Sequence, residues 1–395
     1  MITVARLSAA TLFSVLALVG SADAMSTVVV DVATGKVLSQ ADASERRYPA
    51  STTKLMTTYL AFRAIEAGEA ALDTPVVMTR EAAAEAPSKM WYDPGSVMRL
   101  DNALRMILVK SANDVATAIG QTLAGGSQAR FVEMMNREAE RLGMDDTRFI
   151  NANGLPGPGQ RSSAKDLAIL GMTIRREFPL FAEFFSSEAI STGTEIMRNG
   201  NDLIGQFEGA DGMKTGYICA SGFNVVASAT RDGRTLVAAV LGAPSAITRA
   251  REAALLLENG FRTDPNSVET TIDELPTATG EPLDISEEIC SSTGRTARAN
   301  ERELEDQREL AFGSPYMTRL ERPRAAVHVG LGGAAGTDTI EAGISVIAAY
   351  NIPLPTPRPA RPGDVAQTDP GTGELRPGTG ELPAAAATEE GSDAR

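Results

Sequence analysis

The chain has 395 residues, enough for one large domain or two ordinary ones, and hydrophobic residues make up 43% of it. Its formal net charge of −14 argues against nucleic acid and against an anionic membrane surface as partners. One histidine and two cysteines do not furnish the usual ligand set of a catalytic zinc, so we expect neither a metal nor another cofactor.

The first 24 residues have the features of a secretory signal peptide. Arg6 supplies positive charge, and residues 7–20 are mostly apolar but too short to span a bilayer comfortably. Ala22-Asp23-Ala24 then fits the small-x-small cleavage rule. We expect a mature chain that begins at Met25 in a periplasmic or other extracytoplasmic compartment; the alternative is a buried N-terminal helix. No later apolar run has the length of a transmembrane helix, so membrane attachment is not evident.

Strand patterns flank a block of helix patterns. Residues 26–31 and 37–40 are predicted to form two short strands around a turn. The strongest β signal, at 211–242, predicts three more strands, with a hairpin turn at Asp232-Gly233. Helical periodicity covers roughly 51–68, 101–108, 115–123, 127–142, 162–174 and 245–259. Because the chain ends must meet to join all five strands, we predict an α+β fold, a five-stranded antiparallel sheet flanked by helices with a helical insert.

The composition changes after residue 262. Residues 264–309 contain 13 Asp and Glu against 4 Arg, a pattern typical of a solvated linker. We treat 263–350 as an acidic, partly structured region of uncertain fold. Residues 351–395 contain 8 prolines and are predicted to be disordered. The expected organisation is therefore a signal peptide at 1–24, a catalytic domain at 25–262 and these two C-terminal segments.

The two cysteines are a candidate disulfide. In an oxidising compartment an even number of cysteines favours pairing of Cys219 with Cys290. Two buried free thiols are the alternative, since the distance between them cannot be read from sequence.

Ser51 and Lys54 lie three residues apart where a helix pattern begins, so both side chains point to the same face. Pro49 places Ser51 near the first turn, where free N–H groups suit a developing oxyanion. The pair alone is weak evidence for catalysis, because an N-cap serine beside a solvated lysine gives the same pattern. The only histidine, His328, lies in a poorly patterned region, which leaves Lys54 as the candidate base. It needs burial or a second cation, such as Lys214, to stay neutral part of the time.

Two further motifs supply partners for this pair. Ser111 and Asn113 lie between two helices, where a hydroxyl can relay a proton and an amide can bind a substrate. Lys214 and Thr215 start a strand and can hold a carboxylate. Gly216, without a side chain, lets another backbone approach the strand edge.

In this order, Ser-x-x-Lys, Ser-x-Asn and Lys-Thr-Gly resemble the motif set of penicillin-binding proteins and serine β-lactamases. The surrounding PASTTKLMT, LVKSANDVA, NANGLPGPGQ and DGMKTGYICASGFNVVASA are similar to the D-alanyl-D-alanine carboxypeptidases, the low-molecular-mass penicillin-binding proteins. The resemblance covers roughly residues 25–262 and implies a β-lactamase/transpeptidase-like fold. Many relatives carry a second, β-rich domain and an amphipathic C-terminal helix, and no such helix is evident at 351–395.

The resemblance implies a role for each matched residue. Ser51 would attack the penultimate D-alanine carbonyl of a peptidoglycan stem pentapeptide, and Lys54 would accept its proton. Ser111 would pass a proton to the leaving amine. The substrate would be bound by Asn113, Lys214, Thr215, Gly216 and Tyr217, with the N–H groups of Ser51 and Tyr217 as the oxyanion hole. β-Lactam antibiotics would acylate Ser51 as covalent inhibitors. The family also implies an arginine near the carboxylate pocket, and Arg198 is too poorly matched to be assigned.

Three alternatives stay open at this point. A class A β-lactamase needs a Glu-x-x-x-Asn, but Thr147 stands at the glutamate position before Asn151. A peptidoglycan D,D-endopeptidase shares the whole motif set. A catalytically idle peptidoglycan-binding module would differ only in turnover.

Overall fold

The computed structural model describes residues 25–335 of the chain. The predicted signal peptide at 1–24 and the predicted disordered tail at 351–395 lie outside the described residues. None of the described helices is both long and apolar enough to cross a membrane.

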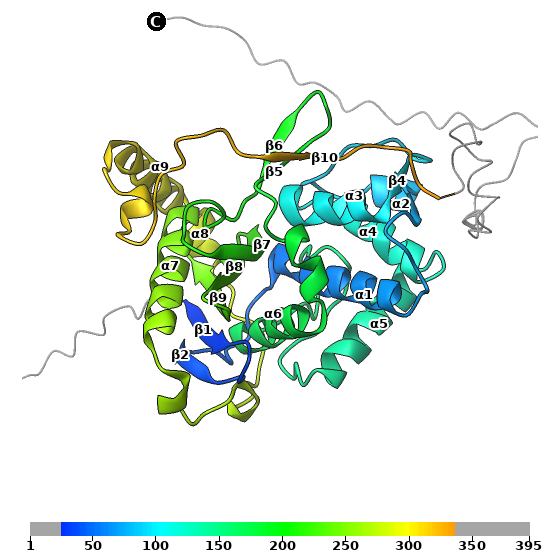
Figure 1. Cartoon of the computed structure of the whole chain (residues 1–395). Helices are drawn as coiled ribbons and strands as arrows, with labels where there is room; N and C mark the ends of the chain where they lie inside the picture. The colour runs from blue at the N-terminus through cyan, green and yellow to red at the C-terminus, as the bar shows by residue number, and fades with distance from the viewer. Residues whose placement is uncertain (1–24, 336–395) are drawn as a thin grey trace, which may run out of the picture. The chain divides into compact units, whose positions relative to one another are not determined.

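The central sheet has five antiparallel strands in the order β2-β1-β9-β8-β7 (Figure 1), which confirms the predicted sheet. β8 and β9 are joined by Asp232 and Gly233, both at positive φ, as expected of a tight hairpin turn. The strands are β1 (Ser26–Asp31), β2 (Val37–Ala41), β7 (Ala210–Ile218), β8 (Gly222–Arg231) and β9 (Arg234–Ala243).

Both faces of this sheet are covered, so its central strands are apolar at consecutive positions. In β1, Val28 and Val30 belong to one buried cluster, which includes residues of α6. Val29 points the other way, into a second cluster with Ala253 and Leu257 of α7. Each valine has no exposed surface. The helices on the two faces are α6 (Ala164–Glu177) and α7 (Ala246–Arg262).

The helical block between β2 and β7 forms a lobe beside the sheet. It also contains two short strands, β3 (Pro75–Val77) and β4 (Val97–Arg99), which the sequence patterns did not indicate. Its helices are η1 (Ala50–Thr53), α1 (Lys54–Glu66), α2 (Arg80–Ala83), α3 (Leu100–Arg105), η2 (Met106–Lys110), α4 (Asn113–Leu123), α5 (Gln128–Arg141) and η3 (Pro179–Phe184).

The acidic stretch 264–309 is not a linker, and that expectation is wrong. It carries η4 (Pro265–Ser267), η5 (Ile272–Glu274), α8 (Ser286–Cys290) and α9 (Ser292–Gln307), followed by η6 (Ala311–Gly313). Ile272 belongs to the same buried cluster as Val28 and Val30, and Ile289 of α8 is buried as well. The acidic residues between them leave no clear periodicity in the sequence.

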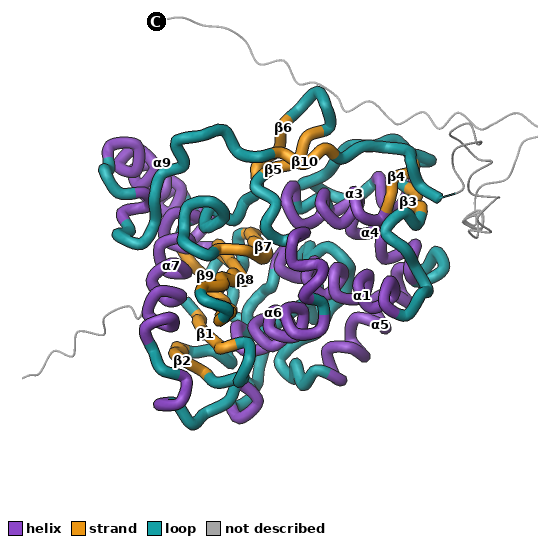
Figure 2. Tube along the Cα trace, in the orientation of Figure 1, coloured by secondary structure: helices purple, strands orange, loops and turns teal. Residues whose placement is uncertain are grey.

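After η6 the chain runs as loop to β10, beside the β5–β6 hairpin (Figure 2). There β10 (Ala326–His328) adds a parallel strand to the hairpin of β5 (Ala189–Ser191) and β6 (Ile196–Arg198). Val329 N–H then donates to Ser191 O at 2.8 Å, and Gly332 N–H donates to Val97 O at 2.8 Å. The segment 314–335 is thereby joined both to the β5–β6 hairpin and to the helical lobe.

Candidate active site

Ser51 lies in η1, directly before α1, where the helical lobe meets the sheet. Asn224 of β8 donates through Nδ2 to the carbonyl oxygens of Tyr48 and Pro49, at 2.9 and 3.2 Å. A Cβ atom on Gly216 of β7 would lie only 2.8 Å from the Ser51 nitrogen. The absence of a side chain at 216 therefore lets β7 pass directly beside the backbone of Ser51.

Lys54 opens α1 and is fully buried behind Ser51. Its Nζ lies 3.0 Å from Ser51 Oγ, 2.7 Å from Asn113 Oδ1 and 2.6 Å from Asn153 O. Burial, and then the nearby Lys214, hold the pKa of Lys54 well below its usual range. A neutral amine has two protons for the amide oxygens and one lone pair, which faces the Ser51 hydroxyl. The geometry suits proton transfer from Ser51 to Lys54.

Ser111 and Lys214 form a second hydroxyl–amine pair. Ser111 ends η2 in the left-handed conformation, with φ 63°, which separates η2 from α4. Lys214 Nζ lies 3.0 Å from Ser111 Oγ. Burial, with Arg249 nearby, lowers the pKa of Lys214 to about 7. This pair can therefore exchange a proton near neutral pH.

Asn113 starts α4 and is fixed from several sides. Its Oδ1 accepts from Lys54, and its Nδ2 donates to Ala86 O at 2.9 Å. Its backbone N–H donates to Ser88 O at 2.7 Å. The side chain lines the cleft and orients the Lys54 amine.

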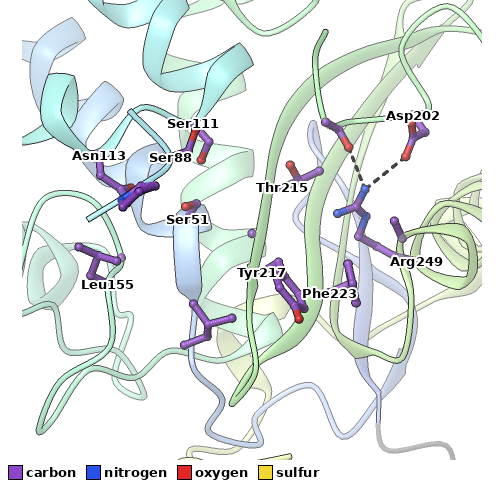
Figure 3. Close-up of a pocket in the computed structure, with 16 residues that line it drawn as sticks. Ser51, Ser88, Ser111, Asn113, Leu155, Asp202, Thr215, Tyr217, Phe223 and Arg249 are labelled. Carbon is purple, nitrogen blue, oxygen red and sulfur yellow. Dashed lines mark hydrogen bonds and ion pairs between the residues drawn. The ribbon is translucent and has the colours of Figure 1, made fainter. Parts of the chain in front are cut away.

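These groups border one cavity of about 540 Å³ (Figure 3). It brings together six of the residues singled out from the sequence, while Lys54 and Lys214 lie buried behind its wall. Cys219 and Cys290 are not among the lining residues. Those six are Ser51, Ser111, Asn113, Thr215, Gly216 and Tyr217, and the wall is completed by residues that include Ser88, Leu155, Gly200, Asp202, Phe223 and Arg249.

Arg249 of α7 is a site residue that sequence reasoning missed. It lines the cavity, and its Nη2 donates to Gly200 O at 2.8 Å and to Asp202 Oδ2 at 3.3 Å. Burial lowers the pKa of Arg249, opposed by Asp202. The usable signal was a charged residue on the apolar face of a helix, next to Ala250. Arg198 is exposed on β6 and does not line the cavity.

The remaining chemical groups do not extend the site. His328 is exposed on β10 and is not a lining residue. Thr147 donates to Asp166 at 2.7 Å and does not line the cavity either, so the glutamate position of a β-lactamase is filled by a structural residue. Within residues 25–335 no group of three His, Cys, Asp or Glu side chains has the geometry of a metal site.

The two cysteines form a disulfide with a Cα–Cα distance of 5.6 Å. It joins Cys219, just after β7, to Cys290 at the end of α8.

Comparison with known proteins agrees with this geometry. Residues 14–245, more than half of the chain, match the family model of the D-alanyl-D-alanine carboxypeptidases, peptidase family S11. The chain is 38% identical over 242 residues to the D-alanyl-D-alanine carboxypeptidase DacD of Escherichia coli, covering 60% of this chain and 62% of the relative. Against DacA of Escherichia coli it is 34% identical over 247 residues, covering 61% of each chain. The match thus spans somewhat over three fifths of these relatives' length.

Solved structures show the same fold. Penicillin-binding protein 6B from Escherichia coli superposes with a TM-score of 0.57 at 37% identity, covering 60% of this chain and 77% of that one. Penicillin-binding protein D2 from Listeria monocytogenes in its ampicillin-bound form gives a TM-score of 0.55 at 29% identity, covering 60% and 96%. The chain belongs to the D-alanyl-D-alanine carboxypeptidase family, peptidase family S11.

Proposed function

We propose that this protein is a serine-type D-Ala-D-Ala carboxypeptidase, which removes the terminal D-alanine from peptidoglycan stem pentapeptides through an acyl-enzyme on Ser51. The observation that carries the proposal is the 3.0 Å contact between Ser51 Oγ and the buried Lys54 Nζ, which opens onto a cavity. Thr215 and Arg249 line the same cavity and offer a hydroxyl and a cation for the terminal carboxylate.

In the first step Lys54 takes the Ser51 proton, and Oγ bonds to the penultimate D-alanine carbonyl carbon. The N–H groups of Ser51 and Tyr217 donate to the oxyanion, an interaction worth about 3 kcal/mol per donor. As the C–N bond breaks, Ser111 gives its proton to the leaving D-alanine nitrogen and recovers one from Lys214. Water then attacks the ester carbonyl carbon, and its hydroxyl group replaces Ser51 Oγ on the released, shortened peptide. The other proton of the water restores Lys214, and Lys54 returns to Ser51 Oγ the proton that it took in the first step.

The substrate backbone has a strand edge to pair with. β7 is the last strand of the sheet, so its outer edge carries no partner strand of that sheet. An extended peptide can add to such an edge through main-chain hydrogen bonds. Gly216 of β7 lies next to Ser51 of η1. A substrate peptide paired with β7 at Gly216 would therefore have its scissile bond beside Ser51.

β-Lactams are the second expected ligand class. Penicillin-binding protein D2 from Listeria monocytogenes was solved in ampicillin-bound and cefotaxime-bound forms, at 29% and 30% identity to this chain. We infer that β-lactams acylate Ser51 here as well. The predicted signal peptide supports action outside the cytoplasm, on peptidoglycan.

Labelling with a fluorescent penicillin tests the proposal. The wild type is expected to take up one covalent label and Ser51→Ala none, and an unlabelled wild type would contradict the mechanism. Release of D-alanine from a stem pentapeptide, set against cleavage of a cross-linked dimer, then distinguishes the carboxypeptidase from an endopeptidase. Rapid catalytic loss of the β-lactam would indicate a β-lactamase, and labelling without peptide turnover an idle binding module.

A further inference from the structure

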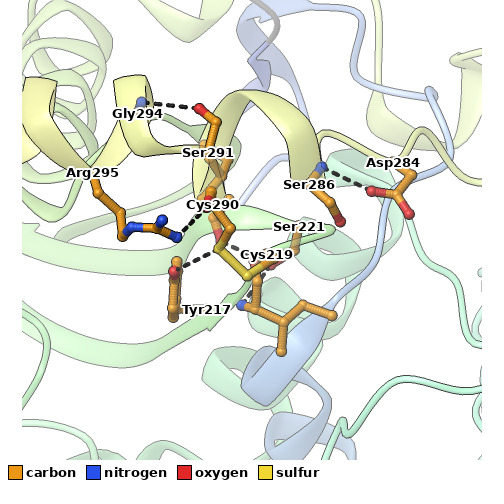
Figure 4. The surroundings of a disulfide bond; sticks show 12 residues. Tyr217, Cys219, Ser221, Asp284, Ser286, Cys290, Ser291, Gly294 and Arg295 are labelled. Atoms are coloured by element: carbon orange, nitrogen blue, oxygen red, sulfur yellow. Dashed lines mark hydrogen bonds between the residues drawn. A yellow bond between two sulfur atoms is a disulfide. The ribbon is translucent and has the colours of Figure 1, made fainter. Parts of the chain in front are cut away.

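The helix pair α8–α9 is linked by a disulfide to the end of β7, the strand that contains Tyr217. Cys219 follows the end of β7 at Ile218, and its disulfide to Cys290 spans 71 residues of sequence (Figure 4). Ile285 N–H, just before α8, donates to Ala220 O at 3.2 Å. The turn after β7 is therefore held by a covalent bond and a main-chain hydrogen bond from outside the sheet.

The same helices contact the side chains of the cavity wall. Cys290 Sγ lies 3.4 Å from Tyr217 Oη. The Tyr217 ring packs on Phe223 with 4.2 Å between centroids, and both residues line the cavity. On α9, the Arg298 guanidinium lies 5.7 Å from the Phe223 centroid. The wall of the cleft at Tyr217 thus rests on α8–α9.

This wall needs such support because of its place in the sheet. β7 has a partner strand of that sheet only on the β8 side, since it ends the strand order. The Tyr217 side chain is 42% exposed. Within the sheet, Tyr217 is held from one side, by its pairing with Phe223 of β8, so the contacts of α8–α9 add restraint to the Tyr217 N–H from outside the sheet.

We propose that Cys219 and Cys290 are positioning residues for acylation. Their disulfide holds α8 against the end of β7 and so fixes the Tyr217 N–H toward the substrate carbonyl. The proposal rests on the proposed function, in which Tyr217 donates to the oxyanion. Because the oxyanion forms only after Ser51 attacks, in the tetrahedral intermediate and the transition states beside it, opening the disulfide should slow acylation more than it weakens substrate binding.

The experiment compares three forms of the full-length protein. One is the oxidised wild type, one is wild type reduced with dithiothreitol and alkylated with iodoacetamide, and one is Cys219→Ser/Cys290→Ser. Mass spectrometry verifies that both thiols are modified, which is simple because the chain has two cysteines. The acylation rate constant with a fluorescent penicillin, and kcat and KM for D-alanine release, are measured well below each form's melting temperature.

The expected result is an acylation rate constant and kcat about ten-fold lower in both opened forms, with KM within about two-fold of wild type and complete final labelling. Arg298→Ala, which keeps the disulfide, should give a smaller loss of the same kind. Unchanged rate constants in the opened forms would overturn the proposal. So would an unchanged rate constant with a lower labelled fraction, since that shows only lost stability. An oxidised wild type that is never labelled would overturn the proposed function itself, and the positioning role with it.

Discussion

Lys54 Nζ lies 3.0 Å from Ser51 Oγ, and its other two hydrogen-bond partners are the neutral amide oxygens of Asn113 and Asn153. Burial, and then the nearby Lys214, lower the pKa of Lys54 and so favour an uncharged amine beside Ser51. A lysine in this state is a base, whereas a solvated lysine is not.

Replacing Lys54 by arginine should abolish acylation. A guanidinium keeps its charge at all working pH values, so Lys54→Arg retains a long basic side chain but cannot supply the uncharged base. We expect a loss of about 10³-fold in the rate of penicillin labelling. Lys36→Arg, on the loop before β2, is the matched control and should label at the wild-type rate. A Lys54→Arg enzyme within ten-fold of wild type would rule out Lys54 as the base.

The pH profile should have two limbs that belong to the two lysines. Burial and Lys214 lower the pKa of Lys54, so kcat/KM falls on the acid side as this amine takes up a proton. Burial and Arg249 lower the pKa of Lys214 to about 7, so above that pH Lys214 no longer has a proton to supply to Ser111, and kcat/KM falls again. Lys214→Arg should remove the alkaline limb. A wild-type profile that keeps rising well above pH 7 would contradict this assignment.

Arg249→Gln should weaken recognition of the terminal carboxylate. The guanidinium is anchored by Gly200 O and Asp202 and faces the cavity. We expect kcat/KM for a peptide ending in D-Ala-D-Ala to fall about 100-fold, the range for one lost charge-assisted contact. A peptide with an amidated C-terminus tests whether Arg249 acts on the carboxylate. The wild type should be much less active on the amide than on the free acid, whereas Arg249→Gln should differ little between the two peptides. If amidation lowered kcat/KM by the same factor in both enzymes, Arg249 would not be a ligand of the substrate carboxylate.

Gly216→Ala should block acylation while the protein stays folded. The added Cβ would lie 2.8 Å from Ser51 N and 3.0 Å from Pro49 O, both backbone atoms that cannot move aside without shifting η1. We expect at least a 100-fold slower labelling rate. Gly330→Ala, whose Cβ would meet His328 at an ordinary 3.5 Å, is the control for a glycine-to-alanine change and should label normally.

Val329→Ala tests whether the C-terminal segment is part of the catalytic domain. Val329 has no exposed surface and belongs to the same cluster as Val28 and Val30. Removing its two methyl groups should lower the free energy of unfolding by about 1–2.5 kcal/mol. Val327→Ala, at a position 37% exposed, should change it by less than about 0.5 kcal/mol. Equal effects in denaturant titrations would mean that this segment contributes no core.

The sequence was most informative where structure is set locally. The runs of β-branched residues and the Asp-Gly turn predicted all five strands of the main sheet. The strands β5 and β6 were not predicted, since each has three residues, and the pairing of β10 with β5 joins residues far apart in sequence. The helix expected to stop at Gly260 continues through it to Arg262 as α7. Gly260 packs so closely that an added Cβ atom would lie 2.9 Å from the Leu236 side chain.

In the candidate site, too, residues in short sequence motifs could be predicted, and residues placed by tertiary packing could not. Ser51, Ser111 and Lys214 stand in short motifs whose order indicated one cleft. Arg249 has no such motif, and only the packing of α7 against the sheet brings it to the cavity. The support of Tyr217 by α9 is likewise tertiary, since it depends on a helix that the acidic composition concealed.

The place of β1 in the sheet bears on when the enzyme becomes active during its synthesis. β1 comes first in the described chain, yet it lies between β2 and β9, and Val29 is paired with Ala238. Ser51 also needs Gly216 of β7 at its backbone. A nascent chain that ends before β9 lacks the strand on which β1 rests, and such distant pairing forms late in folding. Ser51 is therefore synthesised early, but we expect its surroundings to be complete only once the polypeptide through Ala243 has been made.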